Sequence, residues 1–311
     1  MSKPDLLTRG GTALALYTVD DRGALPRLGG ELDEALTRHG AVLVRGLGLA
    51  TADDFGQAVR VFGEPATSYR GGNTPRSTVA TGVFTSTEYP ARYPISQHNE
   101  LSYAPRWPER LYFCCLVPAE TGGATPVCDG RALLADLDPA VRERFTARGV
   151  EYRQHLHGGY GFGKSWQDTF ETTDRAAVEE FLLGADAEFA WTADDDLRIT
   201  QRRPATRAHP RTGEQVWFNQ ADQWHVSNLP GDEAALLVDA VGGEDNLPHN
   251  ARYGDGSALT AADLAAVRDA ARAHTLAVPW RSGDLLIVDN MLVLHGREPY
   301  TGDRRVLVGM I

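Results

Sequence analysis

The sequence predicts a mixed α/β fold with a mainly β core, namely a double-stranded β-helix (jelly-roll) with flanking and inserted helices. Three observations predict it. Short strand-like runs fill both ends of the chain, helical periodicity is concentrated in the middle, and no repeat or low-complexity linker divides the 311 residues. We therefore expect a single domain over residues 1–311, with a helical and loop insertion at about 130–200.

The elements of the first 130 residues follow from periodicity and from Gly and Pro breaks. A helix over 28–39 and a strand over 41–46 are separated by Gly40. Thr51 is a typical N-cap for a helix through about Val61. Two more strands are expected here, a central one that is apolar throughout and a short one: 111–117 and 125–128.

The remaining elements alternate between helices, loops and strands. Residues 157–166 are rich in Gly and aromatic residues, so they form either an ordinary surface loop or a lid over a pocket. The expected helices are 131–148 (one or two), 174–183 and 260–273. The expected strands are a pair, 205–208 and 215–219, and a final β segment of 285–289, 292–294 and 305–310.

The charge and composition of the chain argue against several kinds of binding partner. The net charge is −11 and the pI is about 5.3, which argues against nucleic-acid binding and against anionic membranes. No apolar run approaches the roughly 18 residues of a membrane span, and the N-terminus lacks a signal-peptide pattern. The three cysteines form no CxxC pair, which is typical of reduced thiols in the cytoplasm. We expect a cytoplasmic protein with a small-molecule substrate, and nothing in the sequence excludes a homo-oligomer.

A candidate metal site is split along the chain. His98 and Glu100 are two residues apart, so on a strand both would face one point, although this pattern alone also suits a surface-turn histidine. His295 ends the apolar run 291–294, where it is either a ligand or a core histidine bonded to backbone. Two imidazoles and one carboxylate form the facial triad that holds Fe(II) in non-heme oxygenases and leaves positions open for a cosubstrate and O2.

Two arginines lie at the start of the last expected strand. Arg304 and Arg305 should face opposite sides of it, so one of them should point into the barrel. A guanidinium inside a barrel needs an anion. A dicarboxylic cosubstrate would supply that anion through a bidentate contact.

Taken together, these motifs resemble the taurine/2,4-D dioxygenase-like (TauD/TfdA) family of Fe(II)/2-oxoglutarate-dependent oxygenases. The resemblance covers roughly residues 40–311. The motifs that carry it are, in chain order, Gln97-His98-Asn99-Glu100, Pro118-Ala119-Glu120-Thr121-Gly122-Gly123-Ala124-Thr125-Pro126, Asp289-Asn290, His295-Gly296-Arg297 and Arg304-Arg305-Val306.

The resemblance implies an enzyme, its cofactors and the roles of the matching residues. The residues that would bind Fe(II) are His98, Glu100 and His295, and those that would bind the carboxylate of 2-oxoglutarate are Thr125 and Arg305, with Arg304 as the alternative to Arg305. The implied reaction is hydroxylation of an unactivated C–H bond of a small polar metabolite, such as a free or carrier-tethered amino acid, with release of succinate and CO2. Desaturation or cyclisation with the same cofactors is the alternative.

Departures from the family pattern limit the reactions and substrates that the resemblance predicts. Glu100 stands where the best-known members have Asp, and a carboxylate there argues against halogenation, which needs Ala or Gly at that position. Gly309 replaces an arginine of the sulfonate-binding members, which argues against a taurine-like substrate. Two alternatives come from other classes. They are a zinc hydrolase, since two His and one Glu can also hold Zn(II), and a non-catalytic jelly-roll binding protein.

Four further residues are candidates for substrate binding, each with a structural alternative. Asn219 ends an apolar strand and needs hydrogen-bond partners, which a substrate or a capped turn would supply. Asn99 could reach the pocket edge or orient a ligand. Arg297 could bind a substrate carboxylate or be solvated, and Trp166 could form an aromatic wall or pack the inserted helices.

Overall fold

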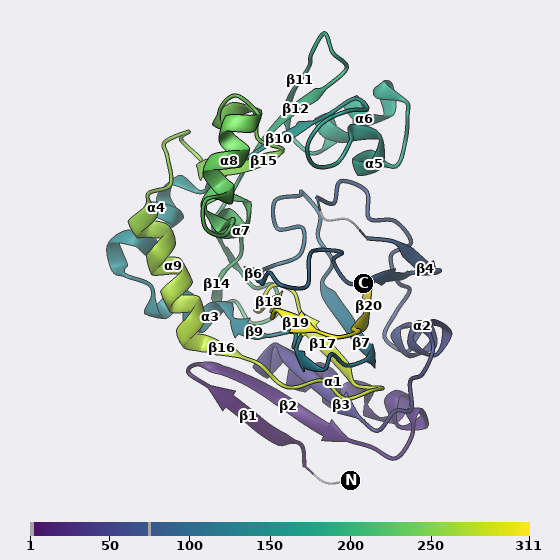
Figure 1. Cartoon of the computed structure of the whole chain (residues 1–311). Helices are drawn as coiled ribbons and strands as arrows, with labels where there is room; N and C mark the ends of the chain where they lie inside the picture. Colours follow the sequence, from purple (N-terminus) through teal and green to yellow (C-terminus); the bar gives the residue numbers. More distant parts are fainter. Residues whose placement is uncertain (1–2, 74–75) are drawn as a thin grey trace.

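The computed structural model describes residues 3–73 and 76–311, and two β-sheets form its centre (Figure 1). The larger sheet has the strand order β1 (Asp5–Arg9), β2 (Thr12–Thr18), β3 (Ala41–Arg45), β17 (Leu285–Asp289), β7 (Arg110–Val117), β20 (Arg305–Met310), β5 (Val83–Thr85), β4 (Thr78–Ala80). The smaller sheet has the order β16 (Thr275–Leu276), β9 (Val127–Asp129), β18 (Val293–Arg297), β6 (Ile95–His98). The expected mixed α/β class with large sheets is confirmed.

The two sheets pack face to face. One apolar cluster combines Phe113 of β7 and Leu286 of β17 with Val127 of β9 and Val293 of β18. Side chains from both sheets therefore share one core. The apolar run of β7 lies at its centre, with Leu111 through Cys115 buried and with β17 and β20 as its neighbours, as expected for a central strand.

Helices cover the outer face of the larger sheet. α1 (Leu25–His39) and α2 (Ala52–Arg60) pack on it through a second apolar cluster. α1 ends at Gly40, whose φ of 74° is left-handed and suits glycine. Thr51 caps α2 as expected, because its side chain accepts from the backbone N–H of Asp54 while the Asp54 carboxylate accepts from that of Thr51.

The middle of the chain contains more β structure than expected. It has the helices α3 (Gly130–Asp136), α4 (Pro139–Arg148), α5 (Trp166–Phe170), α6 (Arg175–Gly184), α7 (Ala221–Trp224), α8 (Glu233–Ala240) and α9 (Ala261–His274). It also has a third sheet with the order β11 (Glu188–Trp191), β12 (Leu197–Arg203), β10 (Val150–Leu156), β15 (His249–Tyr253). Figure 1 shows β10–β12 with α5 and α6 at the end of the molecule opposite the β1–β2 hairpin.

Charged residues conceal β10 in the sequence. Glu151 on this strand is buried, and its carboxylate is paired with Arg153 (2.7 Å) and Arg202 (2.7 Å). The expectation of a purely helical and loop insertion at 130–200 was therefore wrong for β10, β11 and the start of β12. The strands of the β1–β2 hairpin were also not expected.

Two short two-stranded sheets complete the fold. In one, β13 (Thr206–Ala208) pairs with β14 (Gln215–Trp217), as expected, and in the other β8 (Thr121–Gly122) pairs with β19 (Tyr300–Thr301) from the far end of the chain. Among the described residues, no helix is long and apolar enough to span a membrane.

Candidate active site

β6 and β18 bring the two candidate histidine ligands together. His98 pairs with His295 in antiparallel register, and their ring centroids lie 4.3 Å apart. A bulge follows His295, and a Cβ atom added at Gly296 would lie 2.5 Å from the carbonyl oxygen of Ile95. Glycine at position 296 therefore allows the strands to approach closely where the imidazoles meet.

Glu100 reaches these histidines from a turn rather than from the strand that was expected to carry it. β6 ends at His98, and Asn290 holds the residues that follow. The Asn290 side chain accepts from the backbone N–H of Glu100 (2.7 Å) and donates to its carbonyl oxygen (2.9 Å). One ligand atom from each of His98, Glu100 and His295 lies within 4.8 Å of the others, and all three side chains are buried.

Both imidazoles are held in the neutral form that a metal ligand needs. Burial lowers the pKa of His98, although Glu100 partly opposes the shift, and burial together with His98 lowers that of His295 well below its usual range. The carbonyl oxygen of Ser96 lies 2.8 Å from Nδ1 of His98. This contact favours a proton on Nδ1 and leaves Nε2 of His98 free as a ligand atom.

A buried cation and a tyrosine hold the carboxylate of Glu100. Nη2 of Arg76 lies 2.6 Å from Oε2, and the hydroxyl of Tyr69 donates to Oε1. The side chains of Arg76 and Glu100 are each only 3% exposed. Burial opposes the charge on Arg76, but Glu100, Tyr69 and Tyr103 together outweigh it, and the pKa of the guanidinium is raised. Glu100 is therefore an oriented carboxylate beside two neutral imidazoles.

The donor set suits a divalent metal with nitrogen and oxygen ligands. Nε2 of His295 lies 3.8 Å from Oε2 of Glu100, and Nδ1 of His295 is buried without a hydrogen-bond partner in the part of the chain that the structure describes. Such a polar atom costs on the order of 1–3 kcal/mol unless the ring gains compensation. A metal bound at Nδ1 would supply that partner, and Fe(II) accepts this mixed set of donors.

A second polar group lies next to the histidines. Val127 of β9 pairs with His295, and Thr125 lies two residues earlier. Arg304 reaches this point: its Nη2 is 3.4 Å from Oγ1 of Thr125, and its Nε donates to the carbonyl oxygen of Gly123 (2.8 Å). Burial lowers the pKa of Arg304 to about 10, and within residues 3–73 and 76–311 it forms no ion pair. Arg304 is therefore a partly buried cation suited to a carboxylate ligand.

The expectation that Arg305 points inward was wrong. Arg305 is exposed, whereas Arg304 lies against Thr125. The two arginines do face different ways, but the register differs by one residue. β20 begins only at Arg305, and the pairing with β7 shifts between Arg305 and Val306, which alternation along an ideal strand does not anticipate.

The two candidate asparagines have structural partners instead of facing the pocket. The side-chain nitrogen of Asn99 donates to the carbonyl oxygen of Asn290 (2.7 Å), and Asn99 is fully buried and does not line the cavity. The side chain of Asn219 donates to the carbonyl oxygen of Ala205 (2.9 Å) and accepts from the backbone N–H of Ala221 (2.9 Å). Both expectations of substrate binding are therefore corrected, and Asn219 is the capped turn.

Arg297 and Trp166 are also structural. The two terminal nitrogens of the Arg297 guanidinium donate to the carbonyl oxygens of Tyr89, Pro90 and Tyr93 at 2.7–2.8 Å, which holds the side chain against this loop. The indole of Trp166 packs against Trp191 and donates to the carbonyl oxygen of Asp195 (3.1 Å) within the insertion. Neither side chain lines the cavity.

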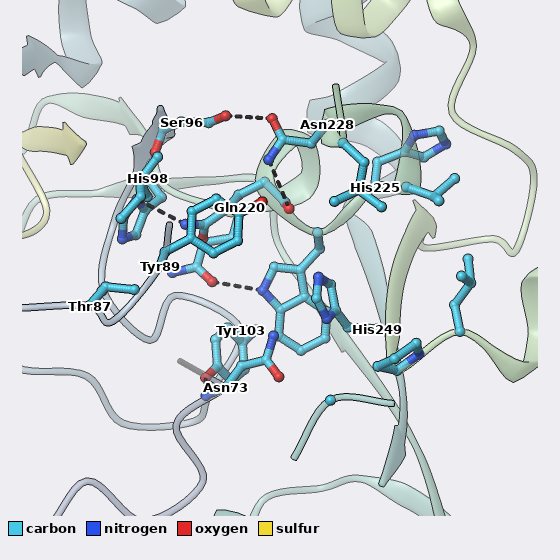
Figure 2. A pocket seen from close by; sticks show the side chains of 18 of the residues that line it. Asn73, Thr87, Tyr89, Ser96, His98, Tyr103, Gln220, His225, Asn228 and His249 are labelled. Carbon is cyan, nitrogen blue, oxygen red and sulfur yellow. Dashed lines mark hydrogen bonds between the residues drawn. The ribbon is translucent and has the colours of Figure 1, made fainter. Parts of the chain in front are cut away.

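A cavity of about 410 Å³ opens beside the candidate ligands. His98 and Glu100 form part of its wall, and Figure 2 shows the side chains of Tyr89, Asn73 and His249 around it. Most of the remaining wall is apolar, contributed by Leu156, Trp224, Val226, Leu229, Pro230, Leu237, Leu247 and Pro248. This volume suits a small organic molecule.

Sequence reasoning missed several residues of this site. Arg76 and Tyr69 lie in a segment without regular pattern, so nothing marked them as partners of Glu100. Gln223, whose amide nitrogen lies 3.2 Å from Nδ1 of His98, follows no recognisable motif. Asn290 was part of a family motif, but its hydrogen bonds to Glu100 depend on the tertiary structure.

Comparison with known proteins agrees with this geometry. The chain matches the family described as taurine catabolism dioxygenase TauD, TfdA family, over residues 16–311. It is 35% identical over 280 residues to the dapdiamide synthesis protein DdaC of Enterobacter agglomerans, covering 90% of this chain and 84% of that protein. It is 32% identical over 293 residues to a clavaminate synthase-like protein of Arabidopsis thaliana, covering 90% and 83%.

A solved structure shows the same fold. PvcB of Pseudomonas aeruginosa superposes with a TM-score of 0.56 at 17% identity, covering 99% of this chain and 90% of that chain. The family match covers every strand except β1 and the first part of β2, together with the three candidate ligands and the Thr125–Arg304 contact. The chain therefore belongs to the TauD/TfdA family, as its motifs predicted, and is a dioxygenase that uses Fe(II), 2-oxoglutarate and O2.

Proposed function

We propose that this enzyme hydroxylates an unactivated C–H bond of a small polar metabolite, such as a free or carrier-tethered amino acid, and releases succinate and CO2. His98, Glu100 and His295 hold the iron, and Thr125 and Arg304 bind the carboxylate of 2-oxoglutarate. The observation that carries the proposal is the convergence of three buried ligand atoms within 4.8 Å beside a cavity of about 410 Å³. When bound, iron and 2-oxoglutarate would supply the oxidising chemistry.

The chain's own residues prepare this site. Asn290 fixes the backbone at Glu100, while Arg76 and Tyr69 orient its carboxylate. The apolar cavity wall would exclude water from the reacting carbon. Arg304 and Thr125 offer a charged donor and a hydroxyl to an acid, and no protein carboxylate pairs with Arg304 among the described residues.

The relatives support a role in biosynthesis more than in taurine breakdown. Two of them are named for dapdiamide synthesis and for similarity to clavaminate synthase. With Arg304 as the carboxylate-binding residue, the position four residues later, where sulfonate-binding members carry an arginine, is Val308 instead of the expected Gly309, and it also lacks the positive charge. Membership of a dioxygenase family argues against a zinc hydrolase and against a non-catalytic binding protein.

The proposal also includes the detailed fold, the number of domains and the cellular compartment. The two facing sheets form a double-stranded β-helix, supported by the apolar cluster that they share. Residues 1–311 form one domain, supported by a single family match over 16–311. The protein works in a reducing compartment such as the cytoplasm, and this part of the proposal is supported by three buried free thiols. Formation of a homo-oligomer and use of a carrier-bound substrate stay predictions.

The test is spectroscopic. Under anaerobic conditions, Fe(II) and 2-oxoglutarate together should produce a visible charge-transfer band that neither produces alone. Replacing His98, Glu100 or His295 by Ala should abolish the band and succinate release, whereas His155→Ala, which removes a histidine paired with Asp196 in the insertion, should not. If the band survives in a ligand variant, that residue does not hold the iron.

A further inference from the structure

Lys164 occupies an unusual position in this chain. It is one of only two lysines among the 31 Lys and Arg residues, the other being Lys3. It lies in the glycine-rich segment 157–166 and lines the cavity that contains His98 and Glu100. An isolated bridge between His157 and Ser165 closes the base of this segment, and a Cβ atom at Gly163 would lie 2.8 Å from Pro248, which also lines the cavity. The segment is therefore packed closely against the cavity wall at the point where Lys164 lies.

No acidic group neutralises this lysine. Its Nζ donates to the carbonyl oxygen of Gly72 (2.9 Å) and forms no ion pair with any carboxylate of residues 3–73 and 76–311. Burial lowers its pKa, although Asp168 and Glu171 oppose the shift from a distance. An ammonium in this setting gains from an anion that enters the cavity.

The other charges on the cavity wall are accounted for. Among the described residues, Glu100 is the one acidic residue that lines it, and its charge is paired with Arg76. Of the lining histidines, His98 is a candidate metal ligand, and burial lowers the pKa of the other two, His225 and His249, that of His249 to about 4, so both are neutral near pH 7. Within the described residues, the wall therefore presents one unpaired positive charge and no unpaired negative charge.

From this balance we propose that Lys164 binds the carboxylate of the organic substrate, and that the cavity accepts an acid with an apolar body and no free ammonium group. Trp224, Leu237 and Leu247 provide the apolar wall for that body. A free amino acid would bring an ammonium for which the wall has no free carboxylate. The inference rests on the proposed reaction and changes its substrate class: N-acylated amino acids or simple organic acids suit this wall, whereas a free or carrier-tethered amino acid, which brings an ammonium group, does not.

Three probes with one carbon skeleton test this inference. They are 3-phenylpropanoate, 3-phenylpropanamide and phenylalanine, titrated into the full chain with Fe(II) and saturating 2-oxoglutarate under anaerobic conditions. Saturating 2-oxoglutarate keeps the probe acids away from Arg304. Quenching of tryptophan fluorescence reports binding, since Trp224 lines the cavity. We expect 3-phenylpropanoate to bind at least tenfold more tightly than the amide or phenylalanine.

Variants and a chemical label locate that preference. Lys164→Met should bring the acid to the affinity of the amide, Lys164→Arg should keep at least part of the preference, and Lys3→Met should leave it unchanged. In acetylation of lysines followed by peptide mass spectrometry, 3-phenylpropanoate should protect Lys164 while Lys3 reacts at its usual rate.

The outcomes separate this inference from the proposed function. Equal binding of the three probes, binding of none, or an acid preference that survives in Lys164→Met would overturn the role of Lys164 even if the charge-transfer band is present. Loss of the band with an intact acid preference would overturn the proposed function and leave Lys164 as an anion site. The band also reports whether each Lys164 variant keeps the folded site.

Discussion

Replacing Arg76 by Met tests whether Glu100 shares its charge with a metal. The pair is buried, with 2.6 Å between Nη2 of Arg76 and Oε2 of Glu100. Removing one partner of a buried ion pair costs about 3–5 kcal/mol, because the other charge stays without compensation. At roughly 2–4 °C per kcal/mol, the metal-free variant should unfold about 6–20 °C lower than the wild type.

A bound divalent cation should offset part of that loss. It would neutralise Glu100 in place of Arg76, so we expect metal to recover at least about 1.4 kcal/mol in the variant beyond its effect on the wild type, equivalent to a tenfold gain in apparent metal affinity. Urea unfolding at pH 8, followed by tryptophan fluorescence with and without Mn(II), measures this difference. Mn(II) accepts similar ligands and is not oxidised by air during the titration.

Arg45→Met is the matched control. Nε of Arg45 lies 3.2 Å from Oδ2 of Asp284, whose side chain is 2% exposed, and neither residue is among the candidate ligands. Its loss of stability should be the same with and without Mn(II). If Arg76→Met also loses the same stability in both conditions, the carboxylate of Glu100 does not face the metal and the proposed ligand set is wrong.

Three further predictions follow from individual contacts. Arg304→Ala should raise the 2-oxoglutarate concentration for half-maximal succinate release by roughly ten- to a hundredfold, since a charge-assisted hydrogen bond is worth about 1.5–3 kcal/mol. Arg305→Ala should leave this concentration unchanged. The opposite result would contradict the placement of these two side chains. Gly296→Ala should lower both the free energy of unfolding and metal affinity, because the new Cβ would lie 2.5 Å from the backbone oxygen of Ile95; unchanged metal binding would rule out this close approach. Burial lowers the pKa of His249 from 6.5 to about 4, so the unfolded chain takes up a proton in this window before the folded chain does, and stability is lost as pH falls from about 6.5 toward 4. Urea titrations at pH 7.5 and 4.5 should show that His249→Phe removes part of this loss of stability, at most about 3 kcal/mol. An identical pH dependence in the variant and the wild type would show that His249 is already solvated.

The strongest predictions from the sequence concerned residues whose roles depend on short spacing and residue type. The His98-x-Glu100 pair, His295 at the end of an apolar run and the glycine-rich stretch before Thr125 together identified the family, which the comparison confirmed. The apolar run of β7 and the cap at Thr51 were also correct, because each depends on neighbouring residues alone.

Predictions failed where a partner distant in sequence decides the outcome. The choice between Arg304 and Arg305 depended on where β20 begins and on its shift against β7. Strand β10 was missed because Arg202, on another strand, pairs with the buried Glu151. In both cases the local pattern was compatible with two structures, and contacts across the sheet selected one.

The type of chemistry follows from residue types and their order along the chain, because the donor atoms of His98, Glu100 and His295 and the cation of Arg304 or Arg305 are properties of those residues. Which polar side chains face a ligand depends on their neighbours in space. Asn99, Asn219 and Arg297 are held by backbone groups away from the cavity, whereas Lys164 lines it and has no acidic partner in the described chain. Hydrogen-bond satisfaction is a matter of three-dimensional neighbours, and for that reason composition and spacing did not reveal it.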